Sequence, residues 1–124
     1  MSGLIVRQRA LLTSKLRETL GDMAVIVTDD SQQARPQSGK VAALIEWPDI
    51  DYPTWGNDPE ITWHVYLIAG TKATQARSLE PISDALDLIA DSDLCVIQAR
   101  PVTFTITNVG DLAAYQLTIN PSDL

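Results

Sequence analysis

The amino-acid sequence predicts a single α+β domain, in which a mainly antiparallel sheet of about five strands carries two helices packed on one face. Two segments repeat apolar residues every three to four positions, as amphipathic helices do. Five further segments are short apolar runs or alternate apolar with other residues, as strands do. The order along the chain is α-β-β-β-α-β-β, and 124 residues fit one domain, 1–124.

The chain opens with a helix predicted over residues 4–20. Its apolar stripe consists of Ile5, Leu12, Leu16 and Leu20. Gly21 follows it, and glycine commonly ends a helix. A short apolar run at 24–28 predicts a buried strand. Residues 41–47 alternate and predict a second strand, which Pro48 ends. The inward face of this strand would carry Val41, Ala43, Ile45 and Trp47.

Two long loops flank this second strand. Residues 29–40 are polar and predict an exposed connection with nothing to bury. Residues 48–59 contain three prolines, but also Ile50, Tyr52 and Trp55. Aromatic residues in such a loop either fold back over the core or are presented to a partner, and the sequence leaves both open.

The middle of the chain holds the longest predicted strand, residues 61–69. Its buried face would carry Ile61, Trp63, Val65, Leu67 and Ala69. A helix is predicted over 73–90, although Pro81 falls within its apolar register and would kink it. The alternative is a short first turn and a helix that restarts near Glu80.

The last part of the chain predicts an antiparallel hairpin. Its first strand lies within 94–107, where Arg100 and Pro101 indicate a bulge or an edge position, because proline cannot donate to a ladder. A turn at 108–111 leads to a final strand over 112–120. Its inward face would carry Ala113, Tyr115, Leu117 and Ile119.

Charge and composition exclude several classes of protein. Sixteen acidic and nine basic residues give a net charge of −7, which disfavours binding to duplex nucleic acid or anionic membranes. We expect no membrane span, because no run approaches about 18–20 apolar residues. Charged residues interrupt the first 20 positions, unlike a secretory signal. Cys95 lies in an apolar run and is interpreted as a buried, inert thiol. A cytosolic or virion-internal protein fits best.

Residues that could carry chemistry are few. His64 is the single histidine, on the less apolar face of the central strand beside Thr62 and Tyr66, and a solvent-facing or interface position is the expectation. The acidic residues of 49–60 do not have the spacing of an EF-hand. We therefore predict no enzyme and no catalytic residue, cofactor or metal site. The alternative is a small ligand-binding enzyme whose loop 48–59 covers His64.

Three segments carry a resemblance to a known family: the strand at 61–69, the helix at 75–90 with its leucine stripe, and the hairpin at 102–119, which ends in Ala-Tyr-Gln-Leu-Thr-Ile. Together with the leading helix and two long loops, this arrangement resembles the tail-terminator (minor tail) proteins of long-tailed phages. The resemblance is one of lengths and periodicity over nearly the whole chain. Pro81 is its clearest departure.

The resemblance implies a virion structural protein without catalysis or cofactor. Such proteins form a hexameric ring at the tail–neck junction that caps the tail tube, ends its polymerisation and joins the tail to the head–neck connector. DNA would pass through the ring without specific binding, no membrane would be involved, and assembly would take place in the host cytoplasm. A head-closure or neck adaptor protein is the alternative.

Two groups of residues are predicted to serve this role. The partner-interface candidates are Arg35, Ile50, Tyr52 and Trp55, because buried aromatics dominate interface energetics. The candidates for an acidic, DNA-repelling lumen are Asp29, Asp30, Asp49, Asp51 and Asp58.

Overall fold

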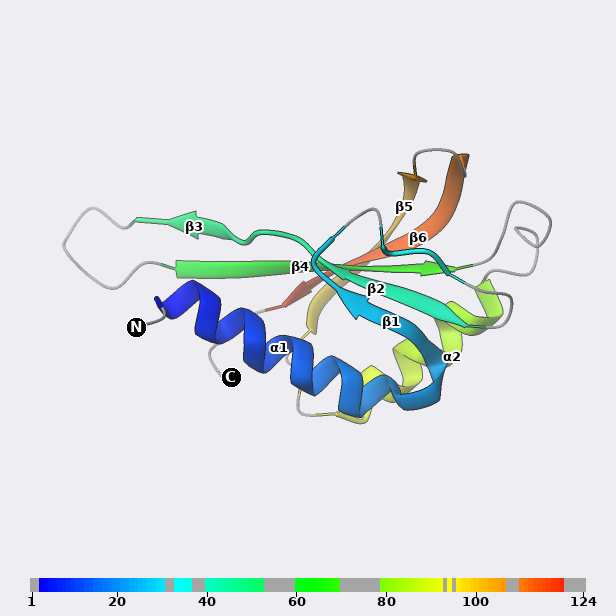
Figure 1. Ribbon diagram of the computed structural model, residues 1–124, viewed down its shortest axis with the longest axis horizontal. Coiled ribbons are helices and arrows are strands. Elements are labelled where there is room, and N and C mark those ends of the chain that lie inside the picture. The colour runs from blue at the N-terminus through cyan, green and yellow to red at the C-terminus, as the bar shows by residue number, and fades with distance from the viewer. Residues whose placement is uncertain are drawn as a thin grey trace.

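A computed structural model describes most of the chain, namely residues 3–30, 33–36, 40–52, 60–69, 79–92, 94, 96–106 and 110–119. These residues form two α-helices, one short 3-10 turn and a six-stranded sheet (Figure 1). The elements are α1 (Leu4–Leu20), η1 (Gly21–Met23), β1 (Ala24–Thr28), β2 (Val41–Ile45), β3 (Asp49–Asp51), β4 (Glu60–Ala69), α2 (Leu79–Ala90), β5 (Val96–Ile106) and β6 (Gly110–Ile119).

The sheet confirms the predicted α+β class and has one strand more than expected. Its order is β1-β2-β4-β6-β5, with β1 parallel to β2 and the other neighbours antiparallel. The additional strand, β3, lies off this path and pairs with the start of β4, where Ile50 is opposite Ile61. The prediction of a loop over 48–59 was therefore wrong for Asp49–Asp51, because β4 begins far enough upstream to offer these residues a partner.

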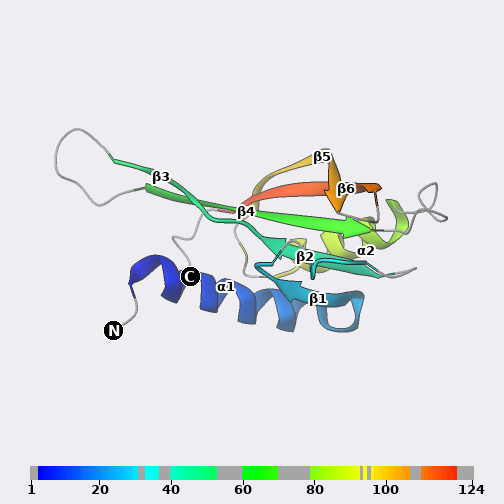
Figure 2. The ribbon, with the colours of Figure 1, turned by 45° about the horizontal axis from the view of Figure 1, so that its top comes forward.

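Both helices cover the same face of the sheet, as predicted (Figures 1 and 2). The predicted stripe of α1 and the stripe of α2 pack against the inward face of β4, and Trp63 at its centre is fully buried. The Trp63 indole Nε1–H donates to Gln8 Oε1 at 3.0 Å, which satisfies the buried polar group. The core positions from the helices are Leu12, Leu16, Leu20, Ile82, Ala85 and Ile89.

Gly21 and Pro81 lie where their backbone preferences favour them, after the last residue of α1 and near the first described residue of α2. Gly21 has φ 52° and ψ −125°, a conformation that glycine adopts readily, and its N–H donates to the Arg17 carbonyl. In α2, Pro81 is the third residue, within the first turn, where an N–H has no acceptor inside the helix. Both the kinked helix over 73–90 and the restart near Glu80 therefore stay predictions, because the residues before Leu79 decide between them. Residues 73–78 of that prediction lie outside the described part.

The other face of the sheet carries a second, smaller apolar cluster. It is centred on Leu44, Ile68 and Leu112, and Val102 and Phe104 pack partly against it. Ala34, from the segment between β1 and β2, is fully buried in this cluster. The prediction that 29–40 has nothing to bury was wrong at this residue, since the second face of β2 and β4 is itself apolar.

The ends of several strands differ from the predictions. β2 ends at Ile45, and Trp47 is 83% exposed, so its assignment to the inward face was wrong. The physical reason is a change of partner: β2 pairs with β4 from Val65 onward, whereas β3 pairs with residues 60–62, and the chain leaves the ladder after Glu46. Pro48, which has no N–H, lies in that connection.

The C-terminal hairpin is confirmed, with Ile106 opposite Gly110. Pro101 lies on β5, an edge strand, so the edge alternative was right, whereas the register shift falls between Val96 and Gln98. The final strand starts at Gly110 and ends at Ile119, with Leu117 and Ile119 facing the core as predicted. Cys95 and residues 107–109 lie outside the described part of the chain.

Candidate protein-interaction surface

Trp47 and Tyr52, the two most exposed large apolar side chains of the described residues, lie at one end of the sheet. There β3 and the first residues of β4 extend beyond the neighbouring strands as a two-stranded arm, with the N-terminal half of α1 alongside (Figures 1 and 2). We call residues 47–52 and 60–62 the arm. Because β3 has only three residues, the arm presents most of its side chains to solvent.

A groove of about 280 Å³ lies between the arm and α1. Ile5, Val6 and Arg9 form its helix wall. Trp47, Pro48 and Ile50 form the opposite wall, and Trp63 also contributes to the lining. All of these residues except Arg9 are apolar or aromatic. We refer to this hollow as the arm groove.

The walls of the arm groove are unusually accessible for apolar residues. Trp47 is 83% exposed, Val6 46% and Ile50 36%, and Tyr52 at the end of β3 is 78% exposed. Leu4 at the start of α1 is 48% exposed. Single exposed apolar residues are common, whereas a contiguous patch rimmed by polar groups is typical of a protein-binding site.

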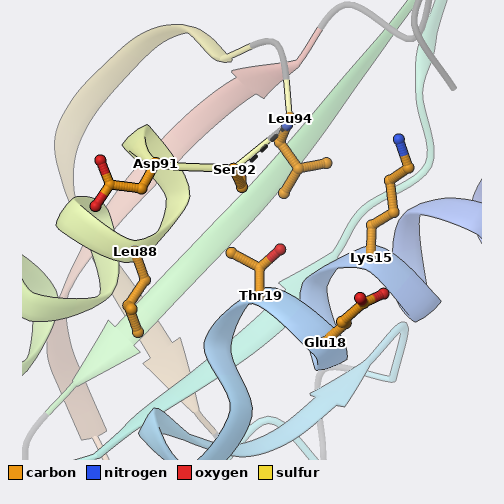
Figure 3. Close-up of a pocket in the computed structure, with 7 residues that line it drawn as sticks. All are labelled: Lys15, Glu18, Thr19, Leu88, Asp91, Ser92 and Leu94. Atoms are coloured by element: carbon orange, nitrogen blue, oxygen red, sulfur yellow. Dashed lines mark hydrogen bonds between the residues drawn. The ribbon is translucent and has the colours of Figure 1, made fainter.

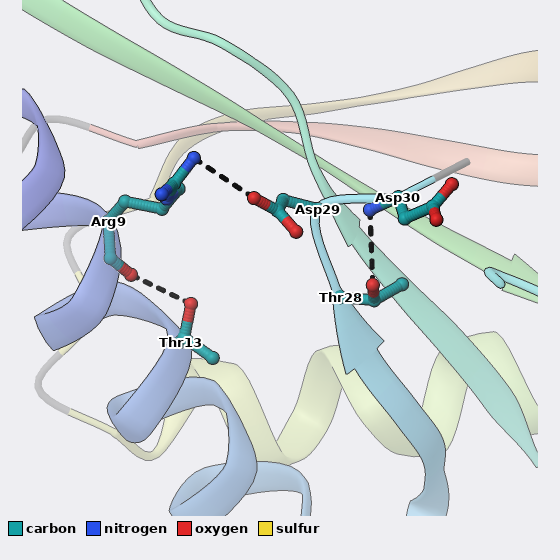
Figure 4. Close-up of polar contacts among 5 residues, drawn as sticks. All are labelled: Arg9, Thr13, Thr28, Asp29 and Asp30. Carbon is teal, nitrogen blue, oxygen red and sulfur yellow. Dashed lines mark hydrogen bonds and ion pairs between the residues drawn. The ribbon is translucent and has the colours of Figure 1, made fainter. Parts of the chain in front are cut away.

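Charged residues surround the arm groove. The Arg9 guanidinium forms an ion pair with Asp29 at 3.0 Å, which joins α1 to the end of β1 (Figure 4). Thr13 Oγ1–H donates to the Arg9 carbonyl at 2.7 Å, and the Asp30 N–H donates to Thr28 Oγ1 at 3.1 Å (Figure 4). Carboxylates also stand on the arm itself, where Asp49 and Asp51 are exposed. Because side chains alternate along a strand, Asp49 and Asp51 lie on the face of the arm opposite Ile50, and Arg9 is the charged residue in the lining of the arm groove.

His64 connects the arm to the middle of β4. Its Nε2 lies 2.8 Å from Asp49 Oδ2, and its side chain is 18% exposed against 73% for Asp49. Nδ1 is buried and has no hydrogen-bond partner among the described residues. This side-chain contact lies on the outer face of the sheet and supports the pairing of β3 with β4. His64 is not among the residues that line the arm groove.

A hydrogen-bonded group centred on Tyr66 lies next to His64 on the same sheet face. Gln116 Nε2 donates to the Tyr66 hydroxyl at 3.1 Å, and the ring centroids of Tyr66 and Phe104 are 5.4 Å apart. Burial, followed by the charge of Glu46 and a hydrogen bond to it, raises the pKa of Tyr66. These contacts join β4, β5 and β6 to the segment after β2, and their role is structural.

Two further hollows flank the core. One, of about 360 Å³, lies between the C-terminal ends of α1 and α2 (Figure 3). Its Ser92 Oγ–H donates to the Ile89 carbonyl at 2.6 Å and accepts from the Leu94 N–H at 3.1 Å, which completes the end of α2. The other, of about 310 Å³, is lined by Asp29, residues 44–46 and Trp47. Trp47 thus borders both this hollow and the arm groove.

The predicted interface residues separate in space. Ile50 lines the arm groove and Tyr52 is exposed beside it. Arg35 follows Ala34, which packs on the opposite sheet face, so Arg35 does not belong to the arm groove. Trp55 lies outside the described residues. Sequence reasoning missed Trp47 and Val6, and the proline directly after Trp47 was the signal that its strand had already ended.

The predicted lumen residues occupy two places. Asp29 and Asp30 follow β1, and Asp49 and Asp51 lie on β3. All four are exposed, although Asp29 contacts Arg9 and Asp49 contacts His64. Asp58 lies outside the described residues. The described acidic candidates therefore lie in two pairs, one after β1 and one on β3, instead of forming one continuous face.

Comparison with known proteins adds no family to this description. No protein-family model and no curated protein sequence matches the chain. In the described part of the chain, no helix is long and apolar enough to cross a membrane. The same residues contain no group of three or more His, Cys, Asp or Glu side chains positioned to hold a metal ion.

Proposed function

We propose that this protein is a structural ring subunit that caps the tail tube of a long-tailed phage, ends tube polymerisation and joins the tail to the head–neck connector. The arm groove carries the proposal: it is an exposed apolar surface around Trp47, with charged residues elsewhere on the arm and on α1, which suits binding to another folded protein. The resemblance in length and periodicity to tail terminators supplies the particular assembly.

The topology supports a ring made by head-to-tail contacts. Such a ring needs two different surfaces on each subunit, and it closes when the rotation between neighbours divides a full turn. One surface is the arm groove, beside the residues that follow β2. A second is strand β5, which ends the sheet at the other edge and is exposed at residues 97–101. Six copies are proposed by analogy with tail terminators.

The charge of the protein supports passage of DNA without retention. The net charge is −7, and Asp29, Asp30, Asp49 and Asp51 are all exposed. Carboxylates lining a channel repel phosphate and prevent the ring from binding the genome as it passes. In this proposal the exposed carboxylates outside the subunit contact face the lumen, and the protein resides at the tail–neck junction of the virion after assembly in the host cytoplasm.

The experiment that tests the proposal is light scattering of the purified protein over a wide concentration range, with negative-stain images of the same fractions. We expect a closed ring with a central hole. The protein is then mixed with purified tail tubes, and we expect the ring at one tube end and no further tube growth. Protein that stays monomeric and leaves tube growth unchanged would refute the proposal, and binding only to the connector would favour a head-closure adaptor.

A further inference from the structure

We propose that the arm groove receives strand β5 of the neighbouring copy, with Ile97 against the apolar wall at Trp47 and Arg100 beside the carboxylate of Asp51. This inference rests on the proposed ring and names the contact that closes it. The occupant is thus a second copy of this chain.

The requirements of the arm groove define the kind of occupant. Its walls offer Trp47 and Ile50, and the arm continues through Asp51, which is exposed. A complementary segment therefore needs an exposed apolar side chain followed, about three or four residues on, by a cation. In an extended chain this separation is roughly 10–13 Å.

Among the described residues, the exposed large apolar side chains distant from the arm are few. Leu79 and Leu88 lie on α2, whose charged residues are all acidic within Leu79–Ala90. Leu11 lies on α1, where the cation four residues on, Lys15, is about 6 Å further along the helix, which is shorter than the separation required. Ile97 is 62% exposed and is followed by Gln98, Ala99 and the exposed Arg100.

Trp47 and Ile97 lie at opposite edges of the sheet, at the two ends of one row of paired residues that crosses β4 and β6. The Glu46 N–H donates to the His64 carbonyl at 3.0 Å, His64 is opposite Thr118, and Thr118 is opposite Gln98. Trp47 follows Glu46 at one end of this row, and Ile97 precedes Gln98 at the other. With strands about 4.8 Å apart, the two ends are separated by roughly 14 Å.

Among the described residues, neither edge has a further strand paired to it at this row. On one side β1 ends at Thr28, opposite Leu44, so its pairing stops before Glu46 and Trp47. On the other side β5 is the last strand of the sheet. A neighbour placed beside the sheet can therefore bring its Ile97 edge to the Trp47 edge of the first copy, and repetition of this step generates a head-to-tail series.

The contact is made by side chains instead of an extended backbone ladder. Pro101 lies in the exposed part of β5 and lacks an N–H, and the register shift near Ile97 also interrupts regular pairing. Proline and bulges on edge strands disfavour addition of another strand. Apolar contact and charge therefore determine the partner and its orientation.

A charge exchange tests this contact. Arg100→Glu and Asp51→Arg are each expected to raise the dissociation constant for ring assembly by about tenfold, because each places like charges together. The double variant restores opposite charges and should recover most of that loss. Lys40→Glu is the matched control, because Lys40 is exposed just before β2, at the end of that strand away from Trp47, and gives the same change of net charge as Arg100→Glu.

The results of these experiments distinguish a failure of the proposed contact from a failure of the proposed ring. Rescue by the double variant, with Lys40→Glu close to wild type, supports the contact. Rings that form normally with either single variant, or single variants that form rings but fail to cap tubes, refute the contact and leave the ring proposal intact. Absence of rings from the wild type, both alone and on tail tubes, refutes both proposals. Ile97→Asp is a second variant that should weaken assembly without lowering the stability of the free subunit, since Ile97 is 62% exposed.

Discussion

Replacement of Trp47 by alanine should weaken assembly while leaving the free subunit stable. The side chain is 83% exposed, so truncation removes little packing, and we expect the free energy of unfolding to change by no more than about 0.5 kcal/mol. A tryptophan that becomes buried removes about 150–250 Å² from water. At about 25 cal/mol per Å², complete burial corresponds to about 4–6 kcal/mol before the costs of association.

The expected loss in assembly is smaller than that gross figure. Interface hot spots cost at least about 2 kcal/mol on truncation to alanine, which is roughly 30-fold in the association constant. Assembly is measured by light scattering against concentration, and subunit stability by urea denaturation at a concentration below assembly. A Trp47→Ala variant that loses more than about 1 kcal/mol of unfolding stability and assembles like the wild type would contradict this prediction.

Trp63→Phe is the matched control for this experiment. Trp63 is fully buried and donates to Gln8, so its replacement leaves a cavity and removes a hydrogen bond. We expect a loss of about 2–4 kcal/mol in unfolding stability. Trp63→Phe should thus lower the stability of the free subunit, whereas Trp47→Ala should not; because Trp63 also contributes to the lining of the arm groove, the two variants are compared in the stability measurement.

Three further predictions test the fold that positions the arm groove. Leu12→Ala should cost about 2.7–5 kcal/mol in unfolding stability, whereas the adjacent Leu11→Ala, at a side chain 48% exposed, should cost less than about 1 kcal/mol; equal losses in denaturation would mean that α1 is rotated. Gly21→Ala should cost about 1–3 kcal/mol by thermal denaturation, because φ is 52° while no atom lies within 4 Å of the added Cβ, and an unchanged Tm would contradict this conformation. The raised pKa of Tyr66 means that the fold favours the neutral phenol; its contribution is fully present below the unfolded pKa of about 10 and is lost as the pH rises through the higher folded pKa. Tyr66→Phe should therefore reduce the loss of stability above about pH 10 in denaturation curves, and identical pH profiles would contradict the assignment.

The elements of the fold were largely predictable because their signals are local. The helix over 4–20 needs only its apolar stripe and Gly21, and the structure has it with the same bounds. The alternation over 61–69 identified the core face of β4 for the same reason. The second apolar cluster was missed, because Ala34, Leu44 and Ile68 become neighbours only through the order of the strands.

The candidate site was less predictable, since it depends on a change of strand partner. Ile50 and Tyr52 were identified because they are apolar and aromatic residues in a predicted loop. The position of Trp47 was not, because alternation from Val41 continues through it and suggests an inward side chain. Only the pairing of Ile50 with Ile61 reveals that β4 exchanges β2 for β3 in this region, so that the chain leaves the ladder after Glu46.

This exchange of partners explains why the arm and the arm groove belong together. A two-stranded ribbon in water is marginally stable alone, and β3 contributes three residues. Two contacts hold it here: His64 Nε2 with Asp49 at 2.8 Å on the outer face, and Ile50 in the arm groove with the helix wall. A partner that fills the arm groove would bury Ile50 further and thereby stabilise β3 against β4. The position of the arm and occupation of the arm groove are therefore thermodynamically coupled, and binding at Trp47 also orders the acidic residues that the arm carries.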